Sequence, residues 1–183
     1  MKTLPLLICL ALAGSVTMAA PLQAAPAAQS VAKGDVASRV QALNALLAEQ
    51  WEYTLKNSPE FATILGDLRY NDHWSDVSLA HMRADHQATQ DFLKRFEAID
   101  TSGFPDSDKL NQQLMVRQLK DSLRSYDLKL YEMPLDQMSG VHIALAGFVS
   151  SIPFNSTREY DDYLARLKAV PKLFDQVAAV ARQ

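Results

Sequence analysis

The stretch VASRVQALNALLAEQWEYTL, residues 36–55, indicates the fold class of this chain. Its apolar residues recur at steps of three or four, which is the spacing of one buried face on an α-helix. They are Val36, Val40, Leu43, Leu47, Trp51 and Leu55. We therefore expect a helix that begins near Asp35 and buries this face.

Signals for helix ends follow directly after this stretch. Ser58 suits an N-cap, Pro59 suits the first helical position and Gly66 suits a C-cap, so a short helix is expected over Pro59 to Leu65. The next segment, GDLRYNDHWSDV at 66–77, mixes turn formers with two aromatic residues. We expect it to be an ordered loop.

Two longer helices are expected in the middle of the chain. Ser78 is placed to cap the first, and the segment TSGFP at 101–105 ends it. The second is expected from about Ser107 to Leu130, where apolar residues again recur in helical steps.

The C-terminal third changes character. From Tyr131 to Phe154 an apolar, nearly uncharged run is interrupted by Pro and Gly, and we expect extended segments with one short helix around Val141 to Phe148. Residues 156–159, STRE, form a capping box that opens another helix, which we expect to break near Pro171. The fold class is therefore mainly α, an irregular multi-helix array over residues 35–183.

The N-terminus has the pattern of a cleavable secretory signal peptide. Lys2 is followed by an apolar run from Leu4 to Met18 and then by small residues. The apolar run is too short and too interrupted to span a bilayer, so we expect no membrane anchor after cleavage. We assign residues 1–25 to the signal peptide and residues 26–34, rich in Ala, Pro and Gln, to a disordered spacer. A periplasmic or secreted location follows.

Composition excludes several classes of function. Cys9 is the only cysteine and would leave with the signal peptide, which excludes disulfides and thiolate metal sites in the mature chain. Removing Lys2 leaves 17 basic residues against 21 acidic ones, a formal charge of −4. A nucleic-acid partner is not expected, because such partners require positive charge.

The histidines do not form a metal-binding pattern. They are His73, His81, His86 and His142, and no His-Glu-x-x-His sequence is present. His81 and His86 differ by about 140° around a helix axis and point to different faces. His81 and Asp85 could share a face, but a catalytic zinc needs a third protein ligand. We predict no catalytic, cofactor-binding or metal-binding residue in this chain.

Four stretches, taken in order, resemble the N-terminal part of a bacterial family catalogued as domain of unknown function 885. They are SPEFAT with GDLRY at 58–70, WSDVS at 74–78, MSGVH at 138–142 and YDDYLARL at 160–167. The resemblance covers about Leu43 to Gln183, which is the first quarter to third of a typical family member.

This resemblance implies an exported, helical, zinc-dependent peptidase-like hydrolase that acts on peptides. Its presumed metal signature, His-Glu followed by Gly-His, lies in the C-terminal half of family members. The chain would then be an inactive, incomplete part of a larger all-α metallopeptidase-like fold, with zinc expected only for the full-length protein. The resemblance places six residues near a substrate cleft: Arg69, Tyr70, Asp76, Ser139, Gly140 and His142.

Two alternatives remain open at this point. One is a stand-alone periplasmic helical module that binds a peptide or a protein through the segment Met133 to Phe154, and the other is the nonfunctional product of a broken gene. An incomplete domain should leave helix faces without partners, and we expect this of Tyr163, Leu167, Phe174 and Val177. The sequence does not indicate an oligomeric state.

Overall fold

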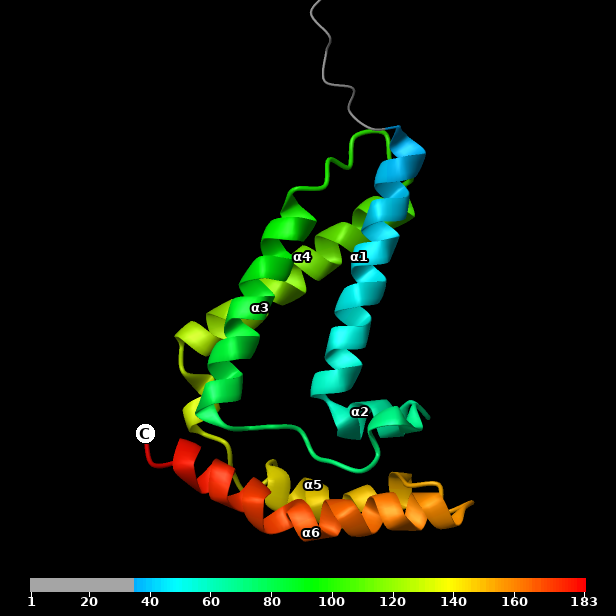
Figure 1. The fold of residues 1–183 in the computed structure, drawn as a ribbon. Coiled ribbons are helices and arrows are strands. Elements are labelled where there is room, and N and C mark those ends of the chain that lie inside the picture. Colours follow the sequence, from blue (N-terminus) through cyan, green and yellow to red (C-terminus); the bar gives the residue numbers. More distant parts are fainter. Residues whose placement is uncertain (1–34) are drawn as a thin grey trace, which may run out of the picture. The chain divides into compact units, whose positions relative to one another are not determined.

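The structure is a computed structural model, and it describes residues 35–183. Within that range the chain forms six α-helices, three 3-10 turns and no β-strand, which confirms the mainly α class. None of these helices has the length and apolar character needed to cross a bilayer. The predicted signal peptide, 1–25, and spacer, 26–34, lie outside the described residues. The helices are α1 (Val36–Asn57), α2 (Pro59–Ile64), α3 (Leu79–Glu97), α4 (Asp106–Asp127), α5 (Val141–Phe148) and α6 (Thr157–Val180) (Figure 1).

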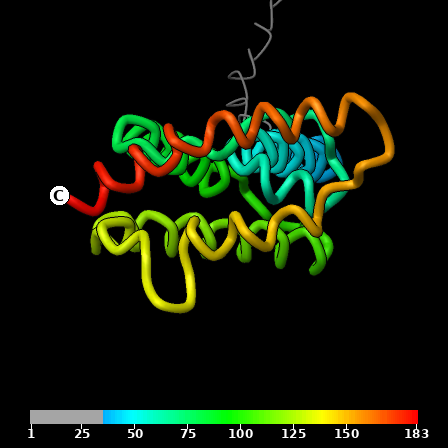
Figure 2. Tube along the Cα trace, turned by 90° about the horizontal axis from the view of Figure 1, so that it is seen from below, coloured from blue at the N-terminus to red at the C-terminus, as the bar shows by residue number. Residues whose placement is uncertain are grey.

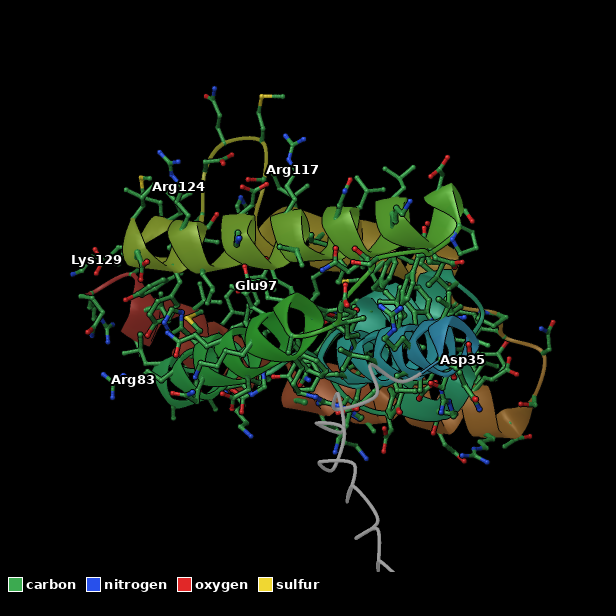
Figure 3. The ribbon with its side chains drawn as sticks, turned by 90° about the horizontal axis from the view of Figure 1, so that it is seen from above. Asp35, Arg83, Glu97, Arg117, Arg124 and Lys129 are labelled. Atoms are coloured by element: carbon green, nitrogen blue, oxygen red, sulfur yellow. The ribbon has the colours of Figure 1, made fainter. Side chains whose placement is uncertain are left out.

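The main hydrophobic core lies between α1, α3 and α4. Figure 1 shows α3 and α4 side by side, and Glu97 at the end of α3 pairs with Lys120 of α4 at 2.6 Å. In Figure 3, Arg117 and Arg124 project from the opposite side of α4. The buried side chains that form this core are Leu43, Leu46, Phe92, Phe96, Phe104 and Leu119.

The buried face of α1 differs from the predicted one at two positions. Trp51 is 46% exposed and meets Phe61 of α2 edge-on, with 6.0 Å between ring centroids. Leu46, which was not predicted, is buried in the core. Helical spacing defines a stripe of residues, but it does not say where along the stripe the neighbouring helices pack.

The predicted helix starts are confirmed, with differences in their capping bonds. The Ser78 hydroxyl accepts a hydrogen bond from the His81 amide at 3.2 Å, as expected of an N-cap. Ser58 precedes α2 but makes no side-chain capping bond. At α6 the Ser156 hydroxyl accepts from the Glu159 amide, while the Glu159 carboxylate accepts from the Asn155 amide, one residue earlier than a capping box requires.

The predicted break at Pro171 is wrong, because α6 is continuous from Thr157 to Val180. Proline removes one backbone donor, yet Leu173 and Val177 beyond it are buried, and their packing favours continuing the helix. The middle helix α4 ends earlier than predicted, at Asp127. Lys129 then adopts a left-handed conformation with φ 55°, which turns the chain into a 3-10 segment.

We expect Leu43→Ala to lower the free energy of unfolding by about 2–5 kcal/mol, because it leaves a cavity in the core. Leu114→Ala is the matched control: Leu114 also lies inside a long helix but is more than half exposed, and its loss should change stability by less than about 0.5 kcal/mol. Urea unfolding followed by circular dichroism measures both. Equal effects would contradict the assignment of the core.

Candidate functional site

Arg166 of α6 is one of the residues that hold the loop 66–77 in place. Arg166 is fully buried. Its Nε donates to the carbonyl of His73 at 2.9 Å, and its Nη2 donates to the carbonyl of Tyr70 at 3.2 Å and to the hydroxyl of Thr63 at 3.0 Å. The loop has little regular structure of its own, so these bonds supply donors that its backbone would otherwise lack.

The same guanidinium is stacked between two aromatic rings. Its carbon lies 5.2 Å from the centre of the Trp74 ring and 4.8 Å from that of Phe148 in α5. In return, Trp74 Nε1 donates to the backbone carbonyl of Arg166 at 2.8 Å. Cation–π contacts of this kind strengthen when they are shielded from water. Arg166 therefore joins the loop, α5 and α6 at one point.

The charge of Arg166 is balanced at a distance. Burial lowers the pKa of Arg166, and the carboxylates of Glu60, Asp72 and Asp162 act in the opposite direction. None of the three forms a direct ion pair with Arg166 among the described residues. Its Nη1 is shielded from solvent and has no hydrogen-bond partner there. The guanidinium stays charged at neutral pH. The groups closest to its positive charge are the faces of the two aromatic rings and the backbone carbonyl oxygens.

An apolar groove of about 450 Å³ lies beside these rings. Figure 2, seen from below, shows the α5 segment and α6 running alongside each other, and the groove has walls from both. Glu60 is the only charged residue in the lining, and its carboxylate accepts from the amide and hydroxyl of Ser75 at 3.0 and 2.5 Å. The other lining residues are Ile64, Trp74, Val77, Val141, Ala144, Leu145, Gly147, Phe148, Ser151, Leu173 and Val177.

Both segments that the resemblance places near a cleft contribute to this groove, but through neighbours of the six named residues. Trp74 and Ser75 come from the loop, and Val141 follows the Ser139–Gly140 turn. None of the six lines the groove. Arg69 instead borders a polar depression, where it is exposed and forms ion pairs with Asp67 and Glu52.

Tyr70 and Asp76 have structural contacts in the loop. The carbonyl of Tyr70 accepts from Arg166, and its ring lies 5.3 Å from the guanidinium of Arg69. Asp76 accepts from the Ser78 amide and from Gln176 of α6, each at 2.9 Å. Partial burial raises the pKa of Asp76, but hydrogen bonds from Ser78 outweigh it and the net pKa lies below its usual value.

Ser139 and Gly140 lie in the turn before α5, and His142 is the second residue of that helix. The hydroxyl and amide of Ser139 both donate to Asp136, at 2.5 and 2.7 Å, and these bonds lower the pKa of the Asp136 carboxyl. Gly140 has φ +123°, and a Cβ there would lie 3.0 Å from the Pro134 carbonyl. Only glycine fits this position without strain. His142 is exposed.

Sequence reasoning missed Arg166, although it lies within the quoted stretch YDDYLARL. A signal was present: Arg166 lies seven residues before Leu173 and eleven before Val177, so all three share one helix face. Both of those residues are buried. A lone charge on a core-facing position indicates a buried residue with a specific partner.

The described residues do not fit a zinc ion. Between residues 35 and 183 no group of three or more His, Cys, Asp or Glu side chains is arranged to hold a metal. A catalytic zinc requires three protein ligands. No catalytic step through a metal can therefore be assigned to these residues.

Residues 59–183 match a family described as bacterial protein of unknown function, DUF885. The chain belongs to this family. The match begins at Pro59 rather than near Leu43, so α1 lies outside it. No curated protein and no solved structure matches the chain. The match includes both walls of the groove and Arg166.

We expect Arg166→Ala to lower the free energy of unfolding by about 3 kcal/mol or more, because it leaves two part-buried carbonyls without their donor, removes the partner of the buried Thr63 hydroxyl and removes two ring contacts. Arg158→Ala on the same helix, at an exposed position, should change stability by less than about 0.5 kcal/mol. Arg166→Lys should recover only part of the loss, since an ammonium lacks the planar fork. Thermal unfolding measures the stability of all three variants. Full recovery of stability by lysine would contradict the hydrogen-bond geometry described for Arg166.

Proposed function

We propose that residues 35–183 are the N-terminal helical part of an exported, zinc-dependent, peptidase-like hydrolase of the DUF885 family. In this proposal the metal-binding groups lie in another part of the hydrolase, and the described helices are inactive alone. Their apolar groove and the neighbouring face of α6 then receive the catalytic part.

The observation that carries the proposal is the exposed apolar face of α6. Its large side chains are between 38% and 53% exposed, a pattern that is typical of a surface covered by another protein element. They are Tyr160, Leu164, Leu167 and Phe174. Of the four residues expected to lack partners, Leu167 and Phe174 are exposed, at 41% and 38%.

The other two expected residues are partly or fully packed. Val177 is buried in the groove wall, and the ring of Tyr163 meets that of Phe154 at 5.4 Å in a T-shaped contact. The uncovered surface is therefore narrower than predicted. It runs along one side of α6 beside the groove.

A second candidate function, the stand-alone module, is favoured by the segment Met133 to Phe154. Met133 and Met138 are 75% and 82% exposed. Flexible, exposed methionines are common on surfaces that bind varied peptides. In this alternative the groove binds a peptide of another protein, and the described helices form a complete, stable unit.

The two candidates differ in the behaviour of the purified chain. As part of a larger fold, it should bind a hydrophobic dye such as ANS and aggregate on concentration, because the α6 face is uncovered. The double substitution Leu164→Glu and Leu167→Glu should reduce dye fluorescence by roughly half. Lys168→Glu, a neighbouring exposed residue of α6, is the control and should not.

A soluble monomer with a sharp, cooperative melt and no dye binding would contradict the main proposal and favour the stand-alone module. The dye experiment is read alongside light scattering, so that fluorescence from aggregates is not counted as binding to the folded chain.

Metal uptake tests the proposal that the metal-binding groups lie outside the described helices. The chain purified in the presence of Zn²⁺ and then desalted should retain substoichiometric zinc and cleave no reporter peptide, because the described residues lack a ligand set. Elemental analysis and a fluorogenic peptide assay measure the two properties. One tightly held zinc per chain, together with EDTA-sensitive cleavage, would contradict the proposal that these helices are inactive alone.

A further inference from the structure

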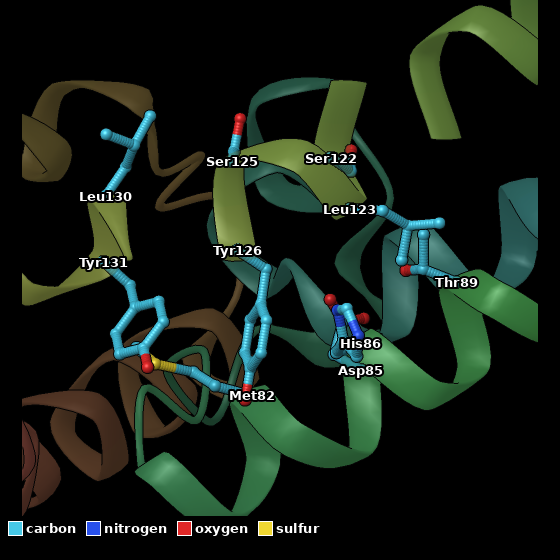
Figure 4. A pocket seen from close by; sticks show the side chains of 10 residues that line it. All are labelled: Met82, Asp85, His86, Thr89, Ser122, Leu123, Ser125, Tyr126, Leu130 and Tyr131. Atoms are coloured by element: carbon cyan, nitrogen blue, oxygen red, sulfur yellow. The ribbon is translucent and has the colours of Figure 1, made fainter. Parts of the chain in front are cut away.

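A smaller cavity, of about 190 Å³, lies between α3, α4 and the turn after α4 (Figure 4). It shares no lining residue with the apolar groove. We call it the tyrosine cavity. Its lining consists of Met82, Asp85, His86, Thr89, Ser122, Leu123, Ser125, Tyr126, Leu130 and Tyr131.

Aromatic rings form one side of the tyrosine cavity. The His86 ring is stacked on Tyr126 with 4.1 Å between centroids, and Tyr131 lies 5.1 Å from Tyr126 at a tilt of 32°. Figure 4 shows the two tyrosines side by side, with the thioether of Met82 near them. The face of a tyrosine ring carries negative charge density and attracts cations.

Asp85 is the only acidic or basic residue in this lining, apart from the histidine. Its carboxylate accepts a hydrogen bond from the hydroxyl of Tyr53 at 2.9 Å. Burial and the hydrogen bond to Asp85 raise the pKa of Tyr53, so the hydroxyl remains a neutral donor. Among residues 35–183 no Lys or Arg pairs with Asp85. The negative charge therefore faces the cavity without a cation.

His86 is also incompletely satisfied. Its Nε2 lies 2.9 Å from Nε2 of Gln90, while its Nδ1 is shielded from solvent and has no hydrogen-bond partner within the described range. Unsatisfied buried polar atoms are rare in folded proteins. Because Nδ1 is shielded, Asp85 and the tyrosine rings, and not this atom, face a ligand in the tyrosine cavity.

We propose that the tyrosine cavity binds an organic cation, the guanidinium or alkylammonium group of an arginine or lysine side chain or of a free amine. The cation donates charge-assisted hydrogen bonds to Asp85 and lies beside the tyrosine rings, where Tyr131 offers the ring face that Tyr126 does not cover. A neutral apolar ligand would shield the carboxylate from water without supplying a positive charge, and an anion would be repelled by it. The available volume suits the end of one long side chain.

The inference does not depend on the proposed hydrolase function, because the two sites share no residue. Calorimetric titration of the full chain tests it with N-acetyl-arginine methylamide and N-acetyl-lysine methylamide. Citrulline and norleucine analogues are the neutral controls of similar shape. The cationic probes should bind saturably and at least about tenfold more tightly than the neutral ones, as expected for a hydrogen bond to a charged group.

Free amines distinguish the source of the cation. If butylammonium and agmatine bind as tightly as the blocked amino acids, the cavity recognises the headgroup alone. If only the blocked amino acids bind, the peptide backbone contributes and a protein segment is the natural ligand. Both results support a cation site. Equal binding of cationic and neutral probes, or no saturable binding by any, would overturn it.

Asp85→Asn removes the charge and keeps the size of the side chain, and it should weaken cation binding at least about tenfold. Asp91→Asn makes the same change on the exposed side of α3, where Asp91 contacts Lys94, and should leave binding within about twofold. Equal losses in the two variants would assign the effect to general surface charge and overturn the proposal.

Tyr131→Leu provides a second variant if Asp85→Asn does not fold, as judged by circular dichroism. Tyr131 lies in the 3-10 turn after α4, is half-buried, and can be replaced with little cost to the core. Losing one ring should weaken cation binding several-fold and leave the weak binding of norleucine amide unchanged. Unchanged cation binding would contradict the role of the rings.

Discussion

The groove side of this structure depends on one buried guanidinium. Arg166 donates to a hydroxyl of α2 and to two carbonyls of the loop 66–77, and two aromatic rings cover its faces. A loop with little hydrogen bonding of its own needs such an external donor to stay ordered. Arginine can provide these hydrogen bonds because its planar guanidinium donates in several directions at once.

The apolar groove and the tyrosine cavity differ in whether a positive charge lies near their carboxylate. In the apolar groove, Glu60 accepts two hydrogen bonds from Ser75 and interacts with the charge of Arg166, and the remaining lining is mostly apolar. In the tyrosine cavity, Asp85 has a neutral tyrosine as its partner and no cation. The first therefore suits a hydrophobic protein surface, and the second suits a positively charged group.

Most helix boundaries and the mainly α fold class could be predicted because their signals are local. Pro59 with Gly66, and Ser78 with its hydroxyl bond to the next turn, act within a few residues of themselves. The prediction was wrong at Pro171, where burial of residues on both sides outweighed one missing hydrogen bond. At the candidate site, the two segments that family resemblance indicated both border the apolar groove, but through neighbours of the six named residues.

By itself, the sequence determined the mainly α class, the helix starts and membership in the DUF885 family, since periodicity, caps and ordered motifs are properties of short stretches. Tertiary structure alone decided which residues of each helical stripe are buried and what Arg166 does. Its bond to Thr63 joins residues 103 positions apart, and its bond from Trp74 spans 92. Contacts over such separations arise only when helices pack, and helical spacing within one segment cannot encode them.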